Sequence, residues 1–207
     1  MTRRTRQRTW ILGGVGLIAC GILGVLPPGG RVGSAPILLV TDVLFAASVL
    51  LFAVGLSRDA SVVSRRPLGV AALAIVAIWP LLSSVITRAM GPGVSPDDGA
   101  WVAYGYIALF IPTAAGLVAA MQIARSDTVP SPWRWAPAWV LGIQALAWAV
   151  SQAVLVTARP ENVQSFADPF HMLGTLASLA ATLGLGILAL ILAARSRPES
   201  VQVYRSP

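Results

Sequence analysis

The most restrictive feature of this sequence is an uncharged run near its C-terminal end, between Asp168 and Arg195. The 26 residues between these two contain no Asp, Glu, Lys or Arg. About 20 apolar residues are enough to cross the hydrocarbon core of a bilayer as a helix. Asp168 is well placed to cap this helix, with Pro169 at the first helical position, where its missing N–H has no cost. The run therefore predicts a membrane-spanning helix over 169–194.

Small residues recur at every fourth position of this predicted helix. Residues four apart lie on one helix face, so they form a stripe along which a second helix can come close. The stripe consists of Gly174, Ser178, Thr182 and Gly186. We expect this face to pack against a neighbouring helix.

Five other apolar runs extend this interpretation to the whole chain. Of its 207 residues, 56% are hydrophobic and 11% are charged, whereas soluble domains carry about 25% charged residues. The sequence predicts an all-α, polytopic membrane protein with six transmembrane helices arranged as three helical hairpins. The expected segments are an arginine-rich N-terminus at 1–9, spans at 10–26, 36–56, 68–87, 100–124, 135–158 and 169–194, and a disordered tail at 195–207.

The arginines alternate in density along the predicted loops. Twelve of the 15 lie in the N-terminus, the second and fourth loops and the tail, and the other loops hold Arg31, Arg88 and Arg159. Arginine-rich connections stay on the cytoplasmic side, so we expect both termini to be cytoplasmic, in a bacterial-type cytoplasmic membrane. No basic patch is interleaved with aromatic residues, so nucleic acid is not an expected partner. The expected partners are the lipid bilayer and a membrane protein or a second copy of the chain.

Asp42 interrupts the predicted second span. A carboxylate at mid-helix costs about 2.5 to 3.5 kcal/mol in a bilayer and normally faces protein or water. One interpretation is that Asp42 marks a proton or ion path lined by Gln144 and Gln152 of the predicted fifth helix. The other is that Asp42 caps a helix near the outer surface, and that the two glutamines make hydrogen bonds between helices.

A second group of polar residues is expected on the outer face. His171 is the one histidine of the chain, and it falls level with Asp98 and Asp168. Histidine and carboxylates can bind a divalent cation, but the sequence has no His-x-x-x-His or Glu-x-x-His spacing. We therefore predict no metal site and no cofactor.

Two further patterns have open interpretations. Leu17-Ile-Ala-Cys20 follows a positive start, as in a lipoprotein cleavage site, but apolar sequence continues beyond it, so Cys20 is either lipidated or a packing residue. Separately, a shift of 70 residues aligns several positions and suggests that the third–fourth and fifth–sixth helices are copies of one hairpin. The aligned positions include Pro67 with Pro137, Asp98 with Asp168, and Ala124-Arg-Ser with Ala194-Arg-Ser.

Three functions are compatible with these observations. The favoured one is a non-enzymatic accessory or interaction protein, because the loops are short and ionisable groups are nearly absent from the spans. The second is a transporter of a small solute or ion that uses Asp42 with Gln144 and Gln152. The third is a membrane enzyme with an outer-face Asp/His site, although the sequence contains none of the familiar catalytic motifs.

Overall fold

The computed structural model describes residues 2–25, 34–56, 60–91, 99–126, 129–131, 133–157 and 163–195. Within these ranges the chain is helical and contains no strand. Six helices are long and apolar enough to cross a membrane. The predictions of an all-α class and of six apolar spans are therefore confirmed, and the six helices are consistent with a multi-pass membrane protein.

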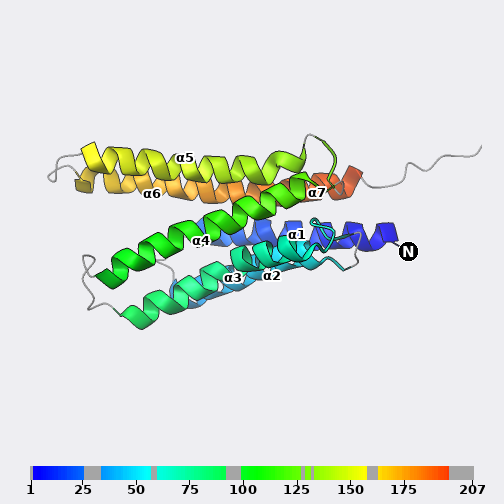
Figure 1. Cartoon of the computed structure of the whole chain (residues 1–207), viewed down its shortest axis with the longest axis horizontal. Coiled ribbons are helices and arrows are strands. Elements are labelled where there is room, and N and C mark those ends of the chain that lie inside the picture. The colour runs from blue at the N-terminus through cyan, green and yellow to red at the C-terminus, as the bar shows by residue number, and fades with distance from the viewer. Residues whose placement is uncertain are drawn as a thin grey trace, which may run out of the picture.

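The helices occupy most of the described chain (Figure 1). Their bounds are α1 Thr2–Val25, α2 Ser34–Val54, α3 Pro67–Met90, α4 Gly99–Ala124, the short 3-10 helix η2 Trp133–Trp135, α5 Ala136–Thr157, α6 Val163–Leu179, the π-helical turn η4 Ala180–Gly184 and α7 Leu185–Arg195. The last three elements follow one another without a break, and the final candidate span, Met172–Arg195, runs from within α6 to the end of α7.

Two predicted helix starts are wrong. The first helix begins at Thr2 and not at Trp10, because its arginines and glutamine are good helix formers and backbone hydrogen bonding does not stop where the apolar run stops. The final helix begins at Val163, so Asp168 is not its N-cap and Pro169 lies inside α6. Helices of membrane proteins tolerate an internal proline when neighbouring groups satisfy the freed carbonyl, so a proline did not mark this helix start.

The other boundaries differ by a few residues. The second span was predicted at 36–56, the third at 68–87 and the fifth at 135–158, against helices at Ser34–Val54, Pro67–Met90 and Ala136–Thr157. Arg195, assigned to the tail, is the last residue of α7, and 196–207 lies outside the described residues. Helix ends are set by local hydrogen bonds and loop geometry, which hydropathy does not report.

Each helix packs against the next in the chain, and α7 packs back against α1. Figure 1 shows α5 and α6 along one edge, α2 and α3 along the other, and α1 and α4 between them. The contacts of α1 are divided mainly between α2 and α7. The first and last helices of the chain therefore lie side by side in the bundle.

The connection between α2 and α3 is part of the core. Val63 is 0% exposed and belongs to a buried cluster with side chains from four other parts of the chain, namely Trp10, Ile123, Val129, Leu192 and Ala193. The Ser61 hydroxyl donates to the Ala53 carbonyl at 2.5 Å and accepts from the Arg65 N–H at 3.1 Å. The described part of this connection, residues 60–66, therefore packs into one end of the bundle, and we call it the stopper.

Hydrogen bonds attach the same connection to neighbouring helices. The Leu56 N–H donates to the Thr9 hydroxyl of α1 at 3.2 Å, and the Ser126 hydroxyl, just after α4, donates to the Val62 carbonyl at 2.9 Å. The Arg65 guanidinium donates to the Val54 and Gly55 carbonyls at 2.8 and 3.1 Å. These carbonyls belong to the C-terminal end of α2, where a cation is favourable.

Candidate functional site

Asp42 makes a polar contact between two helices. The Ser84 hydroxyl of α3 donates to Asp42 Oδ2 at 2.7 Å, and Asp42 is half-buried. Because α2 begins at Ser34, Asp42 lies in the third turn of the helix and is not its cap. The carboxylate therefore sits within the apolar length of α2 and has a hydroxyl partner there.

Two further polar contacts lie on the same helices. The Ser83 hydroxyl of α3 hydrogen-bonds to the Tyr104 hydroxyl of α4. The Cys20 thiol of α1 lies 3.6 Å from the Thr41 carbonyl of α2 and donates to it. Cys20 is buried, as the packing interpretation expects. These contacts join α1 to α2 and α3 to α4, so polar groups link neighbouring helices on both sides of the Asp42–Ser84 pair.

We expect the Asp42–Ser84 bond to be measurable as a coupling energy. In a double-mutant cycle of Asp42→Ala and Ser84→Ala, unfolding in detergent should give a coupling of about 1 kcal/mol, within the range found for hydrogen bonds between transmembrane helices. Ser151→Ala is the matched control, because the Ser151 hydroxyl donates to the Ala147 carbonyl of its own helix. Equal coupling of Asp42 to Ser84 and to Ser151 would contradict the contact.

The glutamines of α5 lie apart from Asp42. Gln144 and Gln152 are both exposed, and α5 packs on α4 and α6, whereas α2 packs on α1 and α3. Gln144 lines a cavity between α5 and α6, together with Trp148, Ser151 and Ser178. Asp42 thus has a partner on α3, Gln144 lines a cavity between α5 and α6, and Gln152 is exposed.

The helix α5 also exposes small residues that sequence reasoning missed. They recur three or four positions apart and so share one face: Gly142, Ala145, Ala149 and Ala153, all exposed. A side chain built on Gly142 would meet no atom within 4 Å. The same spacing rule that we applied to the final helix would have found this face on the fifth.

The predicted small-residue stripe is divided between two environments. Gly174 and Ser178 are exposed, whereas Thr182 and Gly186 are buried. A Cβ on Gly186 would lie 2.8 Å from Ile18 Cγ1 and 2.9 Å from the Gly14 carbonyl oxygen, so α7 meets α1 there at backbone distance. The π-helical turn at Ala180–Gly184 adds a residue to one turn, which rotates the later positions by about 100° around the helix axis.

The predicted outer-face site involves residues whose side chains the structure does not describe. Asp98 and the side chains of Asp168 and His171 lie outside the described residues. Among the residues that the structure describes, no group of three or more His, Cys, Asp and Glu side chains could hold a metal ion.

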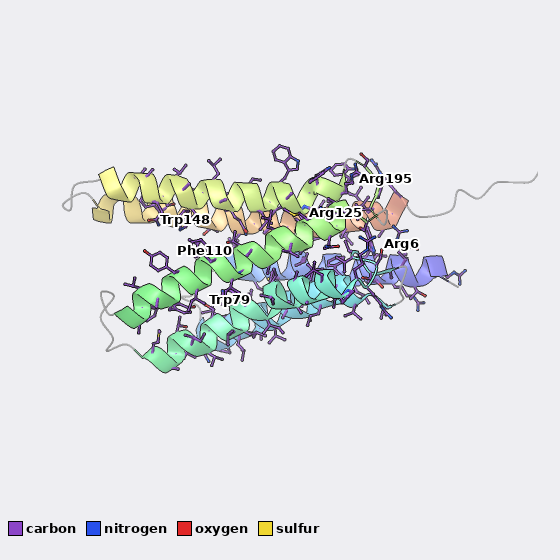
Figure 2. All side chains as sticks on the ribbon, in the orientation of Figure 1. Arg6, Trp79, Phe110, Arg125, Trp148 and Arg195 are labelled. Atoms are coloured by element: carbon purple, nitrogen blue, oxygen red, sulfur yellow. The ribbon has the colours of Figure 1, made fainter. Side chains whose placement is uncertain are left out.

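Arginines gather at one end of the bundle. Figure 2 shows Arg6, Arg125 and Arg195 at the end where α1 begins and α7 ends. Arg65 and Arg66 belong to the connection that closes this end, whereas Arg88 lies near the opposite end of α3. The Arg6 guanidinium stacks over the Trp10 ring at 5.3 Å from its centroid.

Neither a family model, nor a curated protein, nor a solved structure matches this chain.

Proposed function

We propose that this chain is a non-enzymatic interaction protein of the membrane, which associates with a second copy of itself through α5. The observation that carries this proposal is Gln152, an exposed amide inside an apolar span, next to the exposed small residues of α5. Polar side chains at membrane depth normally face protein or water. An amide that its own bundle leaves uncovered therefore favours a partner helix.

The burial of the spans supports α5 as the contact helix. Only 6% of the α5 span is buried, compared with 39% of the α1 span. Exposed leucine or valine needs no partner in lipid, but small residues three or four positions apart let two helix backbones approach closely. The face of Gly142, Ala145 and Ala149 is therefore suited to a second helix.

A second copy of the chain can supply that helix. An amide carries both a donor and an acceptor, so Gln152 on one copy can pair with Gln152 on the other. Two copies related by a two-fold axis would present the same small-residue face to each other, which is the usual geometry of a self-complementary interface. In the same proposal the arginine-bearing end faces the cytoplasm, in keeping with the positive-inside rule.

Cross-linking in native membranes tests this proposal. A benzophenone attached at Ala149→Cys in a Cys20→Ala background should give an adduct of twice the 21.6 kDa chain mass. Leu82→Cys on α3 is the matched control, since Leu82 is 45% exposed and lies as far from the end of its helix as Ala149 does. Adding Gln152→Leu should lower the adduct yield by about threefold, the effect of one average hydrogen bond between membrane helices.

The contradicting results are distinct. Labelling of lipid alone from Ala149→Cys, or the same adduct from Leu82→Cys, would remove α5 as the contact helix. A discrete adduct of another mass would keep α5 as the contact helix and overturn self-association.

A further inference from the structure

Two cavities of different character adjoin at the arginine-bearing end of the bundle. One has a volume of about 150 Å³ and is lined almost wholly by apolar side chains, among them Leu17, Phe52 and Leu188. The other has a volume of about 170 Å³ and is lined by Arg6, Gln7, Trp10, Pro130, Leu192 and Arg195. Trp10 and Leu192 line both cavities, so the polar cavity and the apolar cavity adjoin at these two residues.

Two arginines line the polar cavity. Arg6 comes from the beginning of α1 and Arg195 from the end of α7, and the packing of α1 on α7 brings them to one cavity. Guanidinium groups bind phosphate and carboxylate oxygens through two parallel N–H donors. Two guanidinium groups that line one cavity therefore suit an anion with several oxygen acceptors.

The indole N–H of Trp10, which lines both cavities, has no hydrogen-bond acceptor among the described residues. Trp10 is 5% exposed. A buried indole N–H normally has an acceptor. Trp10 lines both cavities, so an anionic oxygen bound in the polar one would lie beside this residue.

We propose that these two cavities form a binding site for an anionic phospholipid. Its phosphate lies between Arg6 and Arg195, at the level where helix ends meet the headgroups, and basic pockets between membrane helices favour such headgroups. Part of one acyl chain enters the apolar cavity. A cavity of about 150 Å³ lined by aliphatic and aromatic side chains can hold a group of the size of benzene. This volume accommodates a short segment of an acyl chain.

Native mass spectrometry of the purified full chain tests the site. Phosphatidylglycerol should bind about tenfold more tightly than phosphatidylcholine of the same chain length, because only the first lipid has a net negative headgroup. Arg6→Gln with Arg195→Gln should weaken the binding of phosphatidylglycerol by about 30-fold, the effect expected for the loss of two arginines near an anionic headgroup. The matched control is Arg66→Gln with Arg125→Gln, which removes the same charge from exposed positions at the same end.

Two further arms separate a lipid from a free anion. Leu188→Phe narrows the apolar cavity. It should weaken the binding of phosphatidylglycerol by about fourfold for each acyl-chain methylene that it displaces. Inorganic phosphate at the same concentration should not displace the lipid. Size-exclusion profiles and tryptophan fluorescence of every variant confirm that it is folded before its affinity is compared.

Four results would overturn the proposal. They are equal binding of the two lipids, equal loss in the control double variant, no effect of Leu188→Phe, and displacement of the lipid by inorganic phosphate. None of these depends on α5, so the lipid site and the self-association through α5 can fail separately.

Discussion

Gly186→Val is expected to lower the free energy of unfolding by about 3 kcal/mol, near the upper end of the usual cost of overpacking. The reason is the contact between α1 and α7, where a Cβ on Gly186 would lie 2.9 Å from a backbone oxygen of Gly14. A backbone atom cannot rotate away as a side chain can, so the two helices must separate. Unfolding in detergent, followed by tryptophan fluorescence, measures the change.

Gly174→Val is the control for this prediction. Gly174 lies twelve positions earlier in the same span, and a Cβ built on it would meet no atom within 4 Å. We expect its change in unfolding free energy to stay within about 0.5 kcal/mol, as for other exposed positions. Similar losses at both glycines would mean that the α1–α7 approach is not what limits the size of residue 186.

Val63→Asp is expected to destabilise the protein by about 4 kcal/mol, the cost of leaving a buried charge without a partner. Val63 is 0% exposed, and α3 approaches it so closely that a Cβ on Gly69 would lie 2.8 Å from the Val63 Cβ. The variant should therefore fail to give a monodisperse peak in size-exclusion chromatography. Val63→Ala should retain the fold and lose about 2 kcal/mol through the cavity that it leaves.

Leu68→Asp provides the comparison for Val63. Leu68 is 58% exposed and lies in the first turn of α3, where an acidic side chain is favourable to the helix. It should therefore behave as the unmodified protein does. If Val63→Asp and Leu68→Asp gave the same unfolding midpoint, the α2–α3 connection would not be part of the core.

The sequence was most informative about the positions of the spans. Long apolar runs are required by the thickness of the bilayer, so hydropathy located all six helices. The helix starts were less predictable, because Asp168-Pro169 has the composition of a cap but lies inside α6. A capping pattern describes a local preference, which the helical segment beginning at Val163 overrides.

The candidate site depended on packing, which composition does not contain. Asp42 was recognisable as a costly residue, but its partner Ser84 lies 42 positions away and could have been any of several hydroxyls. The stripe from Gly174 to Gly186 assumed an uninterrupted α-helix, and the π-helical turn divides it. Val63 was hidden for a different reason, since it stands in a short polar connection that periodicity assigns to the surface.

The stopper between α2 and α3 also sets an order of assembly. Its buried cluster joins Trp10 and Val63 to Leu192 and Ala193, which are among the last described residues to be synthesised. At ordinary translation rates the ribosome needs on the order of 10 s to proceed from Val63 to Leu192. During this interval Trp10, Val63 and Val129 lack the side chains of α7 that cover them in the finished bundle. The cluster is completed only when α7 has been synthesised.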